Sequence, residues 1–198
     1  MLTFGNAYTQ TAKEILDKSA AKIKGYTAIE VDFELTMENV EENIEEKHLG
    51  KAYMMGNKYK LDIMDVVNYF DGTTMYTYMP DVQEVTIKLP TEEDEEQFNP
   101  VTLFDIHNND FKQKLVSNNN NTAYIELYPN LLDKNFTKIG VWIKTSDHSI
   151  QCIKSFGKDG NNLIISVKSL KQPATLPGAT FFTFDSSAHP EVEVVDMR

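Results

Sequence analysis

The clearest pattern along the chain is an alternation of apolar and polar residues between positions 29 and 38. Every second residue of this stretch is large and apolar: Ile29, Val31, Phe33, Leu35 and Met37. The residues between them are acidic or threonine. A period of two places neighbouring side chains on opposite sides of a strand. The stretch is therefore predicted to form a strand with one buried face and one solvated face.

A helical period precedes this strand. Thr11 and Glu14 have the spacing of a capping box, in which each residue bonds the backbone of the other. Behind Thr11, five residues of low polarity fall on one helical face: Ala12, Ile15, Leu16, Ser19 and Ile23. Gly25 then favours termination. We expect one amphipathic helix over residues 11–24, packed against a sheet.

Several short strands separated by turn signals are predicted between residues 50 and 89. Gly56-Asn57 and Pro80-Asp81 indicate chain reversals. Asp71-Gly72 predicts a two-residue type I′ hairpin turn, because glycine accepts positive φ readily. The strand over residues 73–79 has no charged residue on either side. This composition suggests that protein covers one side and a ligand the other.

The same reasoning predicts strands over most of the chain. Beyond the first, they cover residues 49–55, 58–64, 66–70, 73–79, 82–89, 111–116, 122–128, 137–144, 149–156, 162–170 and 180–184. A short central helix is predicted to begin at Asn99-Pro100 and to carry Leu103 and Phe104. Short meandering connections favour antiparallel neighbours. We expect a mainly β, α+β fold over residues 1–198, with one large curved antiparallel sheet, open or nearly closed, and helices on its concave face.

Composition limits the classes of partner. The chain has 198 residues, a net charge of −11 and a pI of about 4.8. Phosphate binding needs a cationic surface, so nucleic acid is excluded as an expected partner. Electrostatic binding to an anionic membrane is disfavoured for the same reason. No apolar run has the length needed to span a bilayer. Residues 1–8 are interpreted as the possible remnant of a signal peptide.

The sequence contains no compact catalytic signature. Nucleophile-elbow, zinc-protease, dinucleotide-binding and phosphate-loop motifs are all missing, and the four histidines are scattered. The sequence has one cysteine, Cys152, and no paired histidines. It therefore gives no reason to expect a metal site or a cofactor. The chain is rich in adaptable apolar side chains, with 8 Met, 9 Tyr and 11 Phe. Such residues either form core or line a cavity for flexible chains.

The order of these elements resembles the LolA family. The resemblance rests on the leading helix, on Gly50-Lys51-Ala52-Tyr53, and on Lys58-Tyr59-Lys60-Leu61. It also rests on the Asp-Gly-Thr-x-x-Tyr-x-Tyr-x-Pro stretch of residues 71–80, on the Asn99-Pro100 helix, and on the terminal Asp196-x-Arg198. The similarity covers nearly the whole chain, and the order and spacing of these pieces make it specific.

This resemblance implies an incomplete β-barrel with the helices as a lid over a hydrophobic cavity. It implies a monomeric periplasmic carrier, not an enzyme, that takes acylated lipoproteins from an inner-membrane lipoprotein-releasing ABC transporter and passes them to an outer-membrane lipoprotein acceptor. Leu103 and Phe104 would belong to the lid. The expected cavity residues are Phe33, Leu35, Tyr53, Met55, Tyr59, Leu61, Met75, Tyr76, Tyr78, Val141 and Ile143.

One departure from the family pattern keeps alternatives open. The family often has a basic residue followed by proline after the second strand, whereas this chain reads Met54-Met55-Gly56-Asn57. A polar latch to the lid is therefore expected to be missing. The alternatives are a module of the same fold that binds or senses another lipid or hydrophobic ligand, and an enzyme with a dispersed site, such as an esterase.

Overall fold

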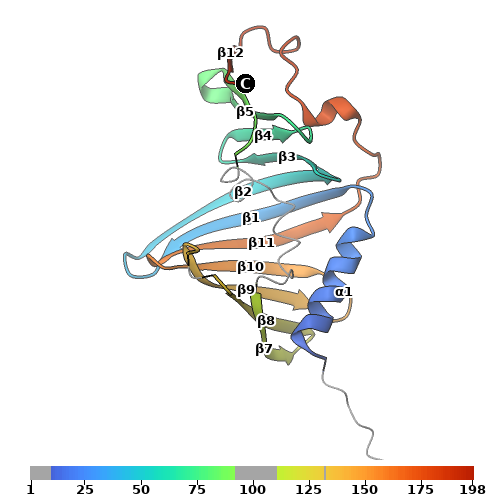
Figure 1. The fold of residues 1–198 in the computed structure, drawn as a ribbon, viewed down its shortest axis with the longest axis vertical. Coiled ribbons are helices and arrows are strands. Elements are labelled where there is room, and N and C mark those ends of the chain that lie inside the picture. Colours follow the sequence, from blue (N-terminus) through green and yellow to red (C-terminus); the bar gives the residue numbers. More distant parts are fainter. Residues whose placement is uncertain (1–9, 92–110, 132) are drawn as a thin grey trace, which may run out of the picture.

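One twelve-stranded sheet forms most of the molecule (Figure 1). The computed structural model describes residues 10–91, 111–131 and 133–198. The strand order is β12-β6-β5-β4-β3-β2-β1-β11-β10-β9-β8-β7. All neighbours are antiparallel except β12 and β6, which pair in parallel. The sheet is open, with β12 and β7 as its edges, so the prediction of one large antiparallel sheet is confirmed.

The order along the chain begins with one helix and continues as a series of hairpins. Strands β1 to β6 are Ile29–Asn39, Ile44–Met55, Lys58–Ile63, Val66–Phe70, Met75–Met79 and Glu84–Lys88. Strands β7 to β12 are Phe111–Asn119, Thr122–Pro129, Phe136–Lys144, Ile150–Gly157, Asn161–Lys171 and Glu193–Asp196. Short 3-10 helices η1 and η3 cover Pro80–Val82 and Ala179–Phe182.

Helix α1, Ala12–Lys24, forms where the capping box predicted it. The Thr11 side chain accepts a hydrogen bond from the Glu14 amide at 3.2 Å, and the Glu14 carboxylate accepts one from the Thr11 amide at 3.0 Å. Two of the amide groups that a helix start leaves unpaired are thereby satisfied. The predicted apolar face is buried at Ala12, Ile15, Leu16 and Ser19.

The two faces of the sheet differ in chemistry. We call the face that carries Val31, Phe33 and Leu35 of β1 the helix face, because α1 packs on it. Its residues continue across the sheet through paired positions, since directly opposed residues project to the same side. We call the other side, which carries Glu30, Asp32 and Glu34, the opposite face.

Different segments cover the two faces at the two ends of the sheet. Helix α1 packs on the helix face over β8, β9 and β10, where its Ile15 and Leu16 join a buried cluster with Ile125 and Val141. At the other end, the C-terminal segment crosses the opposite face of β4 to β6 (Figure 1). The ring of Phe184 lies 5.0 Å from that of Tyr78 and 6.3 Å from that of Tyr69.

Two local predictions differ from the structure. Residues 180–184 do not form a strand, because η3 turns the chain there and the Thr183 amide bonds the Thr180 carbonyl at 3.3 Å. The last strand is instead β12, which the sequence did not indicate. The Asp71-Gly72 reversal is longer than a two-residue turn, since the Asp71 carboxylate accepts bonds from the amides of Thr73 and Thr74. The predicted central helix from Asn99 lies outside the described residues.

Candidate functional site

Beyond the area that α1 covers, the helix face carries a second group of apolar side chains. A second buried cluster lies there, built on Ile29, Val31, Phe33, Ala52, Met54, Tyr59, Phe70 and Met75. Half-buried apolar side chains surround it: Ile23, Tyr26, Leu35, Leu61, Ile63, Ile165, Val167 and Leu170. Ile23, in the last turn of α1, contacts both this cluster and the one beneath the helix. The end of α1 therefore marks the border between the cluster beneath the helix and the second cluster beyond it.

In the second cluster, the Phe33 ring lies over the backbone of Gly50, because this neighbour in β2 has no side chain. Phe33 pairs with Gly50 on one side and with Val167 on the other. A Cβ at Gly50 would stand 2.4 Å from Cζ of the Phe33 ring, closer than any real contact. The absence of a side chain at Gly50 therefore lets the ring cover the backbone of β2, which makes a smooth apolar floor.

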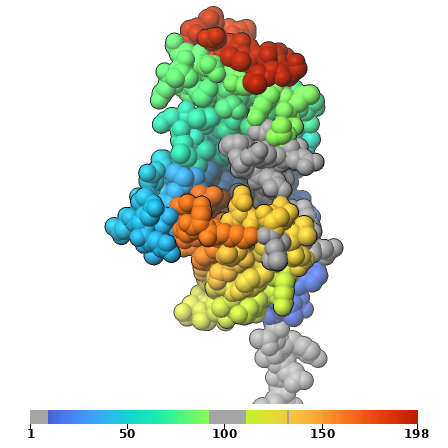
Figure 2. Space-filling model, turned by 60° about the vertical axis from the view of Figure 1, so that its left-hand side comes forward, coloured from blue at the N-terminus to red at the C-terminus, as the bar shows by residue number. Residues whose placement is uncertain are grey.

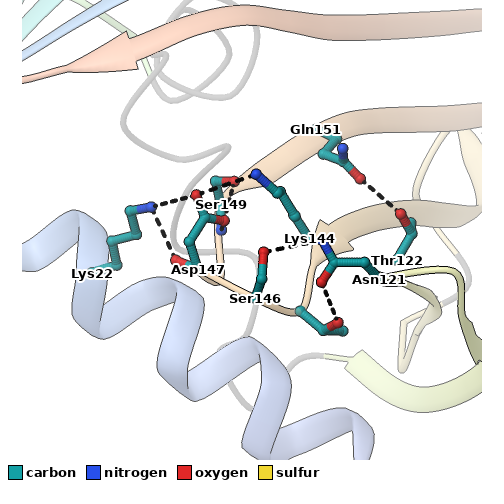
Figure 3. Close-up of polar contacts among 9 residues, drawn as sticks. Lys22, Asn121, Thr122, Lys144, Ser146, Asp147, Ser149 and Gln151 are labelled. Atoms are coloured by element: carbon teal, nitrogen blue, oxygen red, sulfur yellow. Dashed lines mark hydrogen bonds and ion pairs between the residues drawn. The ribbon is translucent and has the colours of Figure 1, made fainter.

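A group of polar contacts fixes α1 over the helix face (Figure 3). Lys22 Nζ donates to the carbonyl of Asp147 at 2.9 Å and lies 3.6 Å from its carboxylate. Asp147 belongs to the turn between β9 and β10, where Ser149 donates to the same carboxylate at 2.6 Å from its hydroxyl. These Ser149 hydrogen bonds, aided by Lys22 and Lys144, hold the pKa of Asp147 at about 2. The carboxylate stays ionised, so this contact is a latch between α1 and the sheet.

The opposite face of the central strands is covered by ion pairs. Lys51 Nζ lies 2.9 Å from Glu30 and 3.3 Å from Asp32. Lys168 lies 3.4 Å from Glu34, and Lys154 pairs with Glu38. The hydrogen bond to Glu30 raises the pKa of Lys51. Such a ladder of charges suits contact with water, whereas the helix face of the same strands is apolar.

A buried carboxylate organises the opposite face of β8 and β9. Glu126 is only 7% exposed and accepts hydrogen bonds from the hydroxyls of Tyr124 at 3.0 Å and Tyr128 at 2.6 Å. Lys138 Nζ, 2.5 Å away, is the main cause that holds the pKa of Glu126 at about 2. The rings of Tyr124 and Trp142 stack 4.4 Å apart. The two hydroxyls and the Lys138 ammonium are all bonded to the Glu126 carboxylate, so its role is structural.

The strand register divides the predicted cavity residues between the two faces. Seven share the helix face: Phe33, Leu35, Tyr59, Leu61, Met75, Val141 and Ile143. The other four project to the opposite face: Tyr53, Met55, Tyr76 and Tyr78. Tyr53 packs there on Phe181 with ring centroids 5.0 Å apart, and Tyr78 packs on Phe184. These four therefore cannot line the same surface as the seven.

Val141 and Ile143 lie beneath α1 in the first cluster and not in the second. The predicted lid residues Leu103 and Phe104 lie outside the described residues. Sequence reasoning missed Ile63, Ile165 and Val167, which pack against the second cluster on the helix face. Alternation along β11 could have indicated Ile165, but a register shift opposite Asp32 and Phe33 breaks that pattern near Val167.

No enclosed cavity lies over the helix face within residues 10–91, 111–131 and 133–198. An open hollow of about 320 Å³ lies on the opposite face of β1 and β2. Its lining combines backbone with charged side chains and one leucine: Asp32, Phe33, Leu49, Gly50, Lys51, Asp62 and Lys168. Charged walls make this hollow unsuitable for an apolar ligand.

The described residues contain neither a metal-binding group nor a membrane-spanning helix. No three His, Cys, Asp or Glu side chains within them are arranged to hold a metal ion. None of their helices combines the length and the apolar composition that crossing a membrane requires.

One known protein family matches most of this chain. The model of the family "Outer membrane lipoprotein carrier protein LolA" matches residues 57–185. The chain belongs to the LolA family. The match begins at the β2–β3 turn and ends in the C-terminal segment, so it includes β3 to β11 but not α1, β1 or β2. LolA-family proteins are carriers rather than enzymes. A comparison with curated protein sequences gives no match.

Solved structures share this LolA-like fold at low sequence identity. An uncharacterized conserved protein from Thermus thermophilus is 11% identical, with a TM-score of 0.59 over 94% of this chain and 99% of that protein. LprF from Mycobacterium bovis is 15% identical, with a TM-score of 0.50 over 85% of this chain and 96% of LprF. At these sequence identities the similarity shows a shared fold.

Proposed function

We propose that this chain is a periplasmic carrier that binds the acyl chains of lipoproteins released from the inner membrane and delivers them to the outer membrane. The observation that carries the proposal is the apolar cluster on the helix face of β1 to β5 and β11, with α1 latched along one side. Membership of the LolA family supports the same conclusion.

The physical need for such a carrier follows from the hydrophobic effect. Each methylene transferred from water to an apolar surface gains about 0.8 kcal/mol. Leaving an acyl chain of about sixteen carbons in water would therefore cost roughly 12 kcal/mol. The helix face shields the chain by direct apolar contact, with Phe33, Leu35, Leu61 and Ile165 as the floor. No bond is made or broken, so the proposal needs no catalytic group.

The proposed binding site contains fewer of the predicted cavity residues than the sequence indicated. Of the predicted cavity residues, Phe33, Leu35, Tyr59, Leu61 and Met75 remain in the proposed site. In this proposal the open sheet is the incomplete barrel that the family resemblance implies, and the segment with Leu103 and Phe104 is its lid. In this proposal, the partners of the chain are an inner-membrane transporter and an outer-membrane acceptor.

The family's basic residue is missing near Met54 to Asn57, but another polar contact joins a helix to the sheet. Lys22 in the last turn of α1 contacts Asp147 in the β9–β10 turn. The departure at positions 54–57 nevertheless favours a second candidate: a LolA-fold module that binds or senses another lipid or hydrophobic ligand.

A release assay separates the two candidates. Purified protein is added to spheroplasts of the source bacterium, and the supernatant is examined for lipoproteins. The carrier proposal expects one-to-one complexes of protein and lipoprotein in the supernatant. Lipid found in the protein by native mass spectrometry, without any release, would support the second candidate and contradict the first.

A further inference from the structure

The chain contains two Asn-x-Thr motifs, the short sequence at which a glycan is attached to an asparagine side chain. Asn120-Asn121-Thr122 lies at the β7–β8 connection, and Asn135-Phe136-Thr137 leads into β9. Both motifs have the same pattern, so their surroundings in the fold must decide which of them a transferase can use.

The Asn120 motif is held in a tight hairpin. Asn120 and Asn121 form the turn with φ values of 47° and 63°, and the residues on either side, Asn119 and Thr122, pair with each other. The Thr122 hydroxyl donates a hydrogen bond to Gln151 at 3.1 Å (Figure 3). An enzyme that binds this motif must separate two paired strands, so the fold makes it a poor acceptor.

The Asn135 motif lies in the loop between β8 and β9. The pairing of these two strands ends at Leu127 and Ile139, so the motif lies beyond it. Asn135 is exposed, and its carbonyl accepts a hydrogen bond from the Lys158 amide at 3.0 Å. Its side-chain amide has no hydrogen-bond partner within the described residues. The nitrogen that would carry a glycan is therefore available for reaction.

Two neighbouring side chains complete this motif. Thr137 is exposed, and its hydroxyl donates to the Phe156 carbonyl at 3.2 Å, a bond that another protein group can replace. Asp133, two residues before Asn135, is also exposed. The other motif has an uncharged residue, Asn118, at the corresponding position. An exposed carboxylate beside the acceptor can pair with a cation on a transferase, which favours the Asn135 motif again.

The Asn135 motif lies far from the contact between α1 and the sheet. Strand β9 begins beside the motif, on the left in Figure 1, and ends at the turn where Asp147 contacts Lys22. Its nine residues span about 30 Å. Figure 2 brings the left-hand end of the sheet forward and shows yellow and orange chain side by side at the surface. A glycan on Asn135 would thus lie about one strand length from the latch.

We propose that Asn135 is a glycosylation site for a membrane oligosaccharyltransferase, with a lipid-linked oligosaccharide diphosphate as the second substrate. In the transfer, Nδ2 of Asn135 forms a bond to the anomeric carbon of the oligosaccharide. The bond between this carbon and the diphosphate oxygen breaks, the lipid diphosphate leaves, and the amide nitrogen gives up one proton. Nothing is oxidised or reduced. The inference rests on the periplasmic location in the proposed function, because this transfer takes place outside the cytoplasm.

The test is the mass of the chain purified from the periplasm of its source bacterium. We expect the wild type to be heavier than its sequence by one oligosaccharide, and peptide mass spectrometry to place the addition on Asn135. Asn135→Gln should have the mass of its sequence. The matched control is Asn120→Gln, which removes the other motif and should keep the addition. Both changes replace one exposed amide side chain by another, so both variants should fold.

Further variants test the two neighbouring side chains. Thr137→Ala should abolish the addition, whereas Thr137→Ser should retain it, because serine keeps the hydroxyl. Asp133→Asn should lower the modified fraction about tenfold, because it removes one charged contact with the transferase. Equal modification of Asp133→Asn and the wild type would contradict the role of the carboxylate.

The outcomes separate this inference from the proposed function. A wild type that has the mass of its sequence but releases lipoprotein from spheroplasts contradicts the glycosylation site alone. A glycosylated chain that releases no lipoprotein supports the site and contradicts the carrier function. An addition that survives in Asn135→Gln and disappears in Asn120→Gln would move the site to the β7–β8 turn and overturn the proposal.

Discussion

At the scale of single residues, the Phe33–Gly50 pair is the most specific feature of the proposed site. Gly50→Ala places a methyl group where the Phe33 ring now lies, 2.4 Å from Cζ. The ring must rise from the floor, and we expect a loss of about 1 to 3 kcal/mol in the free energy of unfolding. Affinity for a fluorescent fatty-acid analogue should fall as well.

Gly140→Ala is the matched control for this change. A Cβ at Gly140 would lie 3.0 Å from the Trp142 and Tyr124 rings, on the opposite face. Thermal unfolding should therefore show destabilisation for both variants, while only Gly50→Ala weakens binding of the analogue. Equal binding losses in the two variants would mean that Phe33 has no particular part in the site.

The Glu126 cluster predicts a dependence of stability on pH. The pKa of Glu126 is about 2 in the folded chain, below its ordinary value of 4.5. A lowered carboxyl pKa stabilises the fold above pH 4.5, and this contribution is lost as the pH falls toward 2. The loss amounts to at most about 3 kcal/mol. Melting temperatures of wild type and Glu126→Gln, measured across this interval, should converge at its acidic end. A constant gap between the two would contradict the prediction.

At the scale of elements, helix α1 depends on a few buried contacts. Ile15 has 0% exposure and packs against the β8–β10 cluster. We expect Ile15→Ala to lower the free energy of unfolding by about 2 to 4 kcal/mol, through lost burial and the cavity it leaves. Lys13→Ala, on the exposed side of the same helix, should change it by less than about 0.5 kcal/mol. Chemical denaturation of both variants measures the difference, and similar losses would mean that α1 is not held by its apolar stripe.

Elements governed by local signals were predictable, whereas those governed by distant contacts were not. Helix α1 and strand β1 follow directly from the capping box and from the alternation over residues 29–38. The Phe181 to Phe184 stretch has strand-like composition, yet its rings pack on Tyr53, Tyr69 and Tyr78 from segments far away in sequence. Strand β12 is only four residues long and exists because β6 offers an edge.

At the scale of the whole molecule, the sequence predicted one large antiparallel sheet but not which residues share a face. Tyr76 and Tyr78 alternate with Met75 along β5, and all three are apolar enough for a lipid site. Only the register places Met75 on the helix face and the tyrosines beneath the C-terminal segment. The expectation that protein covers one side of this strand is met by that segment. The ligand on the other side is part of the proposal.

Neighbouring isoleucines in β11 offer the most direct test of that proposal. Ile165 pairs with Leu35 and Ile153 on the helix face, whereas Ile164 pairs with Thr36 and Lys154 on the opposite face. Both side chains are half-buried.

The measurement is the dissociation constant of a fluorescent fatty-acid analogue for Ile165→Glu and Ile164→Glu, each first shown to be folded by circular dichroism. We predict that Ile165→Glu weakens binding about tenfold or more, because the carboxylate must be desolvated against the acyl chain, and that Ile164→Glu binds like the wild type. Equal affinities in the two variants, or a loss confined to Ile164→Glu, would contradict the assignment of the helix face as the acyl-binding surface.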